Sequence, residues 1–253
     1  LVATGGSLTY QWRRNSVDIP GATSAIYTTP AATAGDNGAV FAVVVTNAGG
    51  SATSADAALT VVSLASAAPP ALPAEVVAGK AANTLNSFVL VRKQDGTLFH
   101  WGDNSVGQGG RGTTSVAADT PTAVTLPAGL RAVQVAAGAG HGLALMDNGV
   151  VYVWGANNAG QLGLDDLANR STPVALALPR PAVAIAAGLS HSVAVLDDGT
   201  VFAWGVNTFG QLGNGNRNSL IVAVPAQVTG ITTAISAAAG NDHTLALLAD
   251  GTV

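Results

Sequence analysis

The sequence predicts an all-β protein, most of which consists of repeated units of one length. Two observations support this prediction. A ten-residue pattern recurs three times, as WGDNSVGQGG from Trp101, WGANNAGQLG from Trp154 and WGVNTFGQLG from Trp204. The three tryptophans lie about 50 residues apart, and a fixed period of that size is typical of solenoids and propellers. Before each of the last two copies, a DNG or DDG tripeptide separates two apolar runs, which predicts a β-hairpin.

The composition excludes several classes of function. The 253 residues are 48% hydrophobic and only 9% charged, with a net charge of −4. Lys80 and Lys93 are the only lysines, so the basic stripe of a nucleic-acid binder is missing and no nucleic-acid partner is expected. The absence of cysteine excludes disulfides, thiol catalysis and cysteine-ligated zinc. No apolar run approaches the roughly 20 residues of a membrane-spanning helix, so no membrane insertion is expected.

Residues 1–62 have a strand pattern that differs from that of the repeats. Leu8 to Arg14 (LTYQWRR) alternates apolar and polar residues, as a half-buried strand does. Ala39 to Asn47 predicts a long strand, and AGG then turns the chain. Ser51 to Val62 predicts the last strand of this segment.

This first segment resembles a bacterial immunoglobulin-like domain. Tyr10 to Trp12 matches the strand that carries the buried tryptophan of such domains, and Asp36 to Gly50 matches their late strand. Phe41 stands where a tyrosine is often found. The bridging cysteines are absent, with Val43 and its neighbours in their place. Because two strands expected before Trp12 are missing, we expect this domain to be cut from a longer polypeptide.

An Ala/Pro-rich stretch, residues 63–75, separates this segment from the repeats. Its prolines disfavour a regular element, so the stretch is interpreted as a semi-rigid linker. The repeats follow, and the fourth stops just before its own Trp-Gly pair. Their expected bounds are 76–132, 133–181, 182–232 and, for the partial unit, 233–253.

Each repeat predicts a four-stranded antiparallel sheet. A short apolar strand leads to a glycine turn, a second strand follows, and a tight turn at Gly149 or Gly199 starts the third strand, which ends at Trp-Gly. A strand-rich unit of this kind, repeated around an axis, is a propeller blade. The first repeat departs from the pattern, since Ser87 or Phe88 stands where the later repeats have histidine.

The repeats resemble the regulator of chromosome condensation repeat, which has the pattern G-x-x-H-x-x-A-L-x-x-D-G-x-V-y-x-W-G-x-N-x-x-G-Q-L-G. Gly138 to Gly163, Gly188 to Gly213 and Gly240 to Val253 follow it closely. The resemblance implies a seven-bladed propeller, of which this chain holds about three and a half blades. We therefore expect the remaining blades to come from a missing part of the chain. Two copies that pair into one ring are the alternative.

Three histidines recur at one position per blade: His141, His191 and His243. Metal ligands must converge on one point, whereas these residues are distributed around a ring. A histidine that hydrogen-bonds backbone at a turn is therefore the favoured interpretation. The acidic residues Asp147, Asp197, Asp198 and Asp250 lack the alternating spacing of a calcium loop, so they are interpreted as turn residues.

The sequence offers little support for catalysis. Ser190, His191 and Asp197 supply the residue types of a hydrolytic triad, but all three belong to the repeat pattern and no G-x-S-x-G motif accompanies them. No phosphate-binding G-x-x-x-x-G-K-[ST] motif is present. We therefore expect a protein that is not an enzyme and has no cofactor or metal.

The loops that follow GQLG differ between repeats, and recognition commonly resides in variable loops on a rigid scaffold. Each loop contains one arginine, a residue type favoured at interfaces. The candidate partner-binding residues are Arg111, Arg170 and Arg217, together with Asp165 and Asp166.

The expected function is a non-enzymatic binding or adhesion scaffold of a secreted or surface bacterial protein, whose propeller loops engage a protein or glycan. The pairing of an immunoglobulin-like segment with a propeller supports this expectation. The alternative is a regulator of a small GTPase that resembles a guanine-nucleotide exchange factor, the function implied by the founding member of the repeat family. The negative net charge and the absence of a basic tail count against that alternative.

Overall fold

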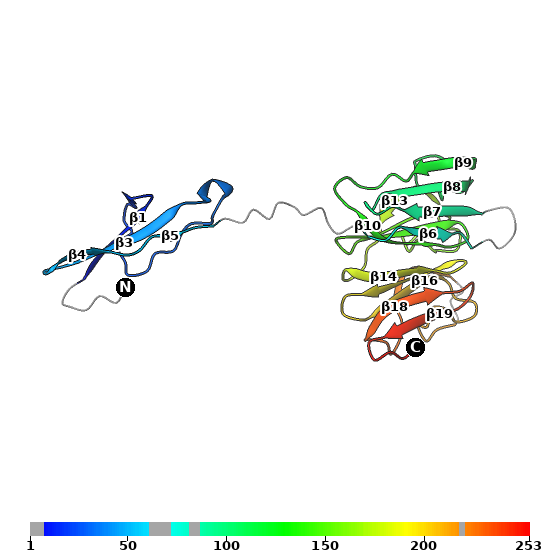
Figure 1. The fold of residues 1–253 in the computed structure, drawn as a ribbon. Helices are drawn as coiled ribbons and strands as arrows, with labels where there is room; N and C mark the ends of the chain where they lie inside the picture. Colours follow the sequence, from blue (N-terminus) through cyan, green and yellow to red (C-terminus); the bar gives the residue numbers. More distant parts are fainter. Residues whose placement is uncertain (1–7, 61–71, 81–86, 218–220) are drawn as a thin grey trace. The chain divides into compact units, whose positions relative to one another are not determined.

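The computed structural model describes residues 8–60, 72–80, 87–217 and 221–253 (Figure 1). The chain divides into two compact units, Leu1–Pro70 and Ala71–Val253. In the described ranges the only helical element is the single 3-10 turn η1, Ala34–Asp36, so the all-β prediction is confirmed. No helix of those ranges is long and apolar enough to cross a membrane.

The described residues of the first unit form one antiparallel sheet. Its strand order is β2-β1-β3-β4, and β5 also pairs with β3. The predicted strand from Ser51 to Val62 is wrong as a single element, because it is interrupted at Ser54. There the Ser54 hydroxyl accepts a hydrogen bond from the Val43 amide at 3.0 Å, and the Ser54 amide donates to the Val43 carbonyl at 2.9 Å. The strands are β1 (Thr9–Arg14), β2 (Val17–Asp18), β3 (Val40–Asn47), β4 (Gly50–Thr53) and β5 (Ala57–Ala58).

Trp12, expected as a buried core residue, is only half-buried on this sheet. Its ring centroid lies 5.9 Å from that of Tyr27, and its indole Nε1 donates to the Ser24 carbonyl at 2.9 Å. The part of the unit that the structure describes contains no second sheet, whereas an immunoglobulin-like sandwich has two. The immunoglobulin-like interpretation therefore stays a prediction.

The described residues of the second unit form three four-stranded antiparallel sheets and one two-stranded sheet, as the repeats predict. Each sheet is named here as a blade, numbered one to four along the chain. Blade one holds β6 (Glu75–Ala78), β7 (Phe88–Arg92), β8 (Leu98–Asn104) and β9 (Ser115–Ala123). Blade two holds β10 (Ala132–Ala137), β11 (His141–Met146), β12 (Val151–Gly155) and β13 (Arg170–Ala175). Blade three holds β14 (Ala182–Ala187), β15 (His191–Leu196), β16 (Val201–Val206) and β17 (Ile221–Gln227), and blade four holds β18 (Ala234–Ala239) and β19 (Thr244–Leu248).

The first strand of the propeller, β6, begins at Glu75, one residue before the predicted start of the repeats. The Glu75 carboxylate lies 3.3 Å from Arg92 Nε and accepts the Val135 amide of blade two at 3.1 Å. These contacts explain why the last residue of the predicted linker belongs to the propeller. Most of that linker, residues 63–71, lies outside the described residues.

Successive blades pack face to face, with an apolar core in each of the three interfaces. Backbone hydrogen bonds also join the turns that follow the first strand of each blade. The Lys80 amide donates to the Gly138 carbonyl at 2.9 Å, and the equivalent amides of Ala139 and Leu189 donate to the Leu189 and Asn241 carbonyls, one residue further along the next turn. The blades therefore form a continuous stack within this unit (Figure 1).

The predicted hairpin turns form, and they also contribute to blade packing. Gly149 and Gly199 have φ of +81° and +80°, a region that L-residues with a Cβ rarely adopt. A Cβ placed on Gly149 would lie 2.5 Å from Pro181 Cβ, which belongs to the segment entering the next blade. Glycine is therefore required here both by the turn and by the neighbouring chain.

Candidate functional site: a tryptophan socket between blades

The tryptophans of the second and third Trp-Gly pairs each enter a socket on the preceding blade. Trp154 and Trp204 are completely buried. The Trp154 indole Nε1 donates to the Gln108 carbonyl at 2.8 Å, and the Trp204 indole donates to the Gln161 carbonyl at 2.9 Å. Both acceptors are the glutamine of the preceding GQ turn, so one contact repeats at two blade interfaces.

The walls of the socket are apolar and close to the ring. Trp204 shares one core cluster with Val151, Leu162 and Leu176 of blade two. A Cβ placed on Gly163 would lie 2.9 Å from Trp204 Cδ1. The second glycine of GQLG therefore has no side chain because the indole of the next blade occupies that space.

Two of the three repeated histidines, His141 and His191, join neighbouring blades through a hydroxyl group. His141 Nε2 lies 3.0 Å from Ser192 Oγ, and Ser192 Oγ donates to the Gln161 carbonyl at 2.8 Å. His191 Nε2 lies 3.0 Å from Thr244 Oγ1, which donates to the Gln211 carbonyl at 2.9 Å. The expectation that these rings bond backbone at a turn is wrong for both, because each contacts a side chain of the next blade.

The hydrogen bonds determine which ring nitrogen carries the proton. A hydroxyl has one proton, and Ser192 gives it to a carbonyl, so it must accept from His141 Nε2–H. The Nδ1 atoms of His141 and His191 are buried without a hydrogen-bond partner, as expected for the unprotonated nitrogen of a neutral imidazole. Burial lowers the pKa of His141 to about 3 and that of His191 to about 4, with smaller effects of nearby charges including Lys80. Both rings are therefore neutral at physiological pH.

The register of strand pairing shows which residue of blade one stands at the histidine position. Phe88 pairs with Gly102 just as His141 pairs with Gly155, so Phe88, and not Ser87, stands at the histidine position. A Cβ on Gly79 would lie 2.4 Å from the Phe88 ring, and one on Gly138 would lie 2.0 Å from the His141 ring. In blades one and two, therefore, an aromatic ring packs against the glycine that follows the first strand.

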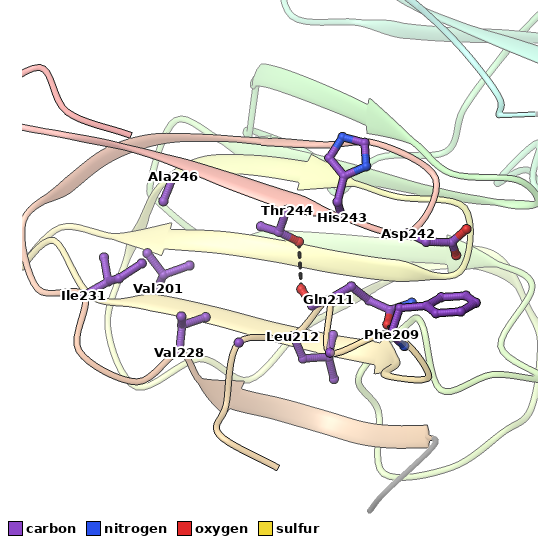
Figure 2. Close-up of a pocket in the computed structure, with 12 residues that line it drawn as sticks. Val201, Phe209, Gln211, Leu212, Val228, Ile231, Asp242, His243, Thr244 and Ala246 are labelled. Carbon is purple, nitrogen blue, oxygen red and sulfur yellow. Dashed lines mark hydrogen bonds between the residues drawn. The ribbon is translucent and has the colours of Figure 1, made fainter. Parts of the chain in front are cut away.

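Between blades three and four, the space equivalent to the one that Trp204 fills between blades two and three is a cavity of about 310 Å³ (Figure 2). Val201, Leu212 and Ala246 contribute apolar side chains to it, and Thr244 donates to the Gln211 carbonyl at one end. His243 and Phe209 also line it, and Phe209 is 65% exposed. This cavity is referred to below as the open socket.

Two of the four acidic hairpin residues, Asp198 and Asp250, stabilise their own turns. Asp198 Oδ1 accepts the Thr200 amide at 3.0 Å and the Thr200 hydroxyl at 2.6 Å, and these bonds hold the pKa of Asp198 below its ordinary value. Asp250 and Thr252 repeat the arrangement. Within the described residues, no group of three His, Cys, Asp or Glu side chains is placed to hold a metal ion.

The triad-like residues do not form a charge-relay arrangement. His191 uses Nε2 for Thr244, and its Nδ1 has no partner that would orient the ring. Asp197 instead lies 2.6 Å from Arg180 Nε.

Two of the five loop residues selected from the sequence bind one another. Arg170 and Asp166 form an ion pair at 2.5 Å, and Arg170 Nη1 also donates to the Ala168 carbonyl at 2.6 Å. Asp165 has a φ of +60°, and its amide donates to the Ala223 carbonyl of the next blade. Arg111 is half-buried and Arg217 is exposed. The structure therefore places Asp166 and Arg170 in the internal bonding of their loop.

Sequence analysis missed the asparagine of the Trp-Gly-x-Asn pattern. Asn157 is completely buried; its Oδ1 accepts the Leu162 amide at 2.9 Å, and its Nδ2 donates to the Asp166 carbonyl at 2.8 Å. Asn104 and Asn207 hold their own turns in the same way. The asparagine stands at the same position in all three copies of the pattern, and this recurrence was the indication of its role in the sequence.

Lys80 was also missed. Its Nζ donates to the carbonyls of Ala187, at 2.6 Å, and of Ala239 and Gly240 in blades three and four. Partial burial lowers the pKa of Lys80. The residue occurs once, so the repeat pattern gave no signal for it.

Blades joined by buried tryptophans define the second unit as a β-propeller repeat protein. The family model for the regulator of chromosome condensation (RCC1) repeat matches residues 95–145, 148–195 and 198–247, and a second RCC1 repeat model matches 132–161 and 182–211. The chain belongs to the RCC1 repeat family.

Curated relatives share the repeats over short stretches. The human probable E3 ubiquitin-protein ligase HERC3 is 44% identical over 88 residues, which are 35% of this chain and 8% of that protein. The mitochondrial RCC1 domain-containing protein RUG3 of Arabidopsis thaliana is 37% identical over 87 residues, or 34% of this chain and 19% of that protein. The matches therefore span less than a fifth of these relatives.

Solved structures show the same fold. Human WBSCR16 has 28% identity and a TM-score of 0.60, over 70% of this chain and 46% of that one. Prp20p of Saccharomyces cerevisiae has 22% identity and a TM-score of 0.58, over 67% of this chain and 42% of that one. At 22% identity, the likeness to Prp20p concerns the fold alone.

Proposed function

We propose that this protein is a non-enzymatic scaffold that binds another protein through the loops following its GQLG turns. RCC1-repeat proteins are protein-binding propeller scaffolds. The observation that carries the proposal is that, within each repeat, recurring residues and variable residues occupy different places. Residues that recur between blades, such as Trp204, Gln161 and Asn157, are buried in blade packing, whereas the residues that differ between blades gather in the loops.

Within these loops, Arg217 and Asp165 are the exposed candidates. An exposed arginine can form bidentate hydrogen bonds with a partner carboxylate, and it adds contact area through its apolar stem. Arg170 and Asp166 act differently, because their ion pair shapes the loop that presents Asp165. We therefore expect a partner to depend on Arg217 and Asp165 directly and on Arg170 through loop shape.

The chemistry of the repeats supports a non-enzymatic role. The two buried histidines are neutral and are engaged with hydroxyls, so they do not offer a general base with a pKa near 7. The finer proposal is a secreted or surface-displayed bacterial protein whose partner is a protein or a glycan. The resemblance of residues 1–62 to immunoglobulin-like modules supports that setting, and detection of the full-length protein on intact cells by surface proteolysis tests it.

The test of binding is comparative affinity capture. The immobilised full chain is incubated with protein extracts and with a glycan array, beside the Arg217→Ala and Asp165→Ala variants. Arg13→Ala is the matched control, because Arg13 lies on β1 of the first unit and is partly exposed. A partner retained by the parent and by the control, and lost by the loop variants, supports the proposal. Equal recovery on all four proteins contradicts it.

The second candidate is regulation of a small GTPase. The fold shared with Prp20p, which is described as binding Gsp1p and histones, motivates it. Accelerated release of labelled nucleotide from small GTPases in the presence of this chain would support that function and replace the adhesion proposal.

A further inference from the structure

The segment that connects blade two to blade three crosses over the hairpin of its own blade. Both ends of this crossing are fixed by backbone hydrogen bonds. The Leu176 amide donates to the Val151 carbonyl at 2.8 Å, and the Ala182 amide donates to the Gly149 carbonyl at 2.8 Å. Residues 177–181 therefore span the hairpin between two fixed points.

A cavity of about 230 Å³ lies between this segment and the hairpin. Val151 and Leu176, which are buried, line it together with the half-buried Val150 and Leu178. Pro179 also lines it, and its ring fixes φ at that point of the crossing segment. Because the walls are held in place before a ligand arrives, binding costs less ordering of the protein. This space is called the hairpin cavity below.

The hairpin cavity is separate from the open socket. It lies within blade two, and the blades on both sides of blade two belong to this chain, whereas the open socket lies beside β19. Its crossing segment also departs from the repeat pattern, since Leu178 to Pro181 is LPRP where blade three has GITT from Gly230. Blade three still fixes its segment to its hairpin, because the Ala234 amide donates to the Gly199 carbonyl at 3.0 Å. The fold therefore does not require the residues that line this cavity in blade two.

Arg180 lines the cavity, and acidic residues surround it. Its Nε lies 2.6 Å from Asp197 Oδ1 and 3.5 Å from Asp198 Oδ2, both on the hairpin of blade three. Asp147 belongs to the hairpin of blade two, and in the described part of the chain it accepts the Arg131 amide but forms no ion pair. Three carboxylates beside one guanidinium leave a surplus of two negative charges at this site.

We propose that the hairpin cavity binds an aliphatic side chain from a basic peptide segment of a partner protein. An apolar cavity of about 150 Å³ can hold a benzene ring, whereas drug-sized ligands occupy pockets of about 300–1,000 Å³. The hairpin cavity therefore has room for one side chain. A lysine or arginine beside that side chain lies against the surplus carboxylates, and this complementarity selects basic over acidic segments.

This site is distinct from the loops of the proposed function. β12 begins at Val151, which lines the cavity, and ends at Gly155, and the loop with Asp165 follows that end. The cavity and the loop therefore belong to opposite ends of one strand. Loss of binding at one of them leaves the other proposal untouched.

The probe is the synthetic pentapeptide GKLKG, capped at both ends, which is added to the isotope-labelled full chain and followed by NMR. GKAKG and GELEG are the comparison peptides. We expect GKLKG to bind at least about tenfold more tightly than GKAKG, because the leucine side chain leaves water. GELEG is expected not to bind, and added salt should weaken binding of GKLKG. The amide signals that shift are expected to include those of Val150 and Leu178.

One protein variant fills the cavity. Leu178→Phe enlarges a side chain that lines it and is expected to abolish binding of GKLKG. Leu126→Phe is the matched control, because Leu126 follows Val124 in blade one as Leu178 follows Leu176, and both leucines are partly buried against the core. Thermal unfolding of both variants establishes that they fold.

A second pair of variants tests the charge without changing the apolar walls. Asp147→Asn should weaken binding of GKLKG about two- to fivefold, as expected for the loss of one exposed charge pair. Asp119→Asn, on the exposed part of β9 in blade one, removes the same charge elsewhere and should leave the affinity unchanged.

Several results would overturn the proposal. They are equal binding of GKLKG and GKAKG, tighter binding of GELEG, and no binding of GKLKG at millimolar concentration. Signal shifts confined to the loop around Arg217 would place the peptide on the loops and not in the cavity. Self-association of the chain that Leu178→Phe abolishes would show that a second copy, and not a basic peptide, occupies the site.

Discussion

Blades three and four have nearly the same sequence pattern in their first two strands but differ in burial. All six residues of β15 are buried, whereas β19 alternates between half-buried and exposed residues. Val193 and Val195 are fully buried, while their counterparts Leu245 and Leu247 are 51% and 37% exposed. The strands form in both blades, so the repeat pattern determines local structure, and the neighbouring blade determines burial. Repeat proteins in which packing between adjacent repeats supplies most of the burial behave in this way.

The largest effect on this comparison is expected from Trp204→Ala. The change removes a completely buried ring between blades two and three, together with its hydrogen bond to Gln161. We expect the free energy of unfolding to fall by about 3–5 kcal/mol, as for other buried aromatic residues. Chemical denaturation measures the loss. Trp101→Ala is the control, since Trp101 is half-buried in blade one, and an equal loss for both variants would contradict the socket model.

The second prediction compares one substitution at equivalent positions. Leu143→Ala truncates a fully buried side chain in blade two, whereas Leu245→Ala truncates one that is 51% exposed in blade four. We expect a loss of about 2–5 kcal/mol for Leu143→Ala and a change within about 0.5 kcal/mol for Leu245→Ala. Denaturant unfolding of the two variants under the same conditions checks the difference. Similar losses would show that a neighbour covers blade four in solution.

The third prediction concerns the hydroxyl that joins blades. Ser192→Ala removes the acceptor of His141 Nε2 and leaves that buried N–H without a partner. An unsatisfied buried donor costs about 1–3 kcal/mol, so we expect a loss of stability in that range. Thr244→Val in blade four should cost less, because Thr244 is only half-buried and water can reach its surroundings. Equilibrium unfolding of both proteins provides the measurement.

The smallest expected effect is a dependence of stability on pH, caused by the buried histidines. The pKa of His141 is about 3 in the folded protein, against 6.5 for a free histidine, so the unfolded state binds a proton first as the pH falls. Stability is therefore full above pH 6.5 and decreases below it, by about 1.4 kcal/mol per pH unit for each such histidine. His141→Phe, which copies the arrangement of Phe88, should reduce this slope between pH 6.5 and 5. An unchanged slope in denaturant titrations over that range would contradict the assignment of a buried neutral ring.

Sequence reasoning predicted the blades because the evidence for them is local. Gly149 and Gly199 specify hairpin turns, and the alternating residues around them specify strands, so the three complete blades and the partial fourth are confirmed. The histidine contacts were not predictable from the pattern alone. Their partners, Ser192 and Thr244, stand at a position where blade two has Gly142 and blade one has Val89, so nothing at this position repeats.

The site was predicted less well than the fold, because its contacts are not local in the sequence. A contact between blades joins residues about 50 positions apart, and only the tryptophan side of it has a distinctive residue type. The acceptor is the backbone carbonyl of Gln161, which any residue would supply. The loop residues Arg170 and Asp166 were selected for partner binding, but their ion pair depends on a loop conformation that residue types do not specify.

Lys80 carries a consequence for how the propeller folds. Its ammonium group reaches carbonyls 107 and 159 residues further along the chain, in blades three and four. Contacts of such high sequence separation form late, since the intervening chain must be ordered first. A stack of repeats would otherwise assemble by independent steps from any blade. With Lys80 in place, the segment after β6 completes its contacts only when blades three and four are formed, so a single side chain couples the folding of blade one to two blades that are not adjacent to it.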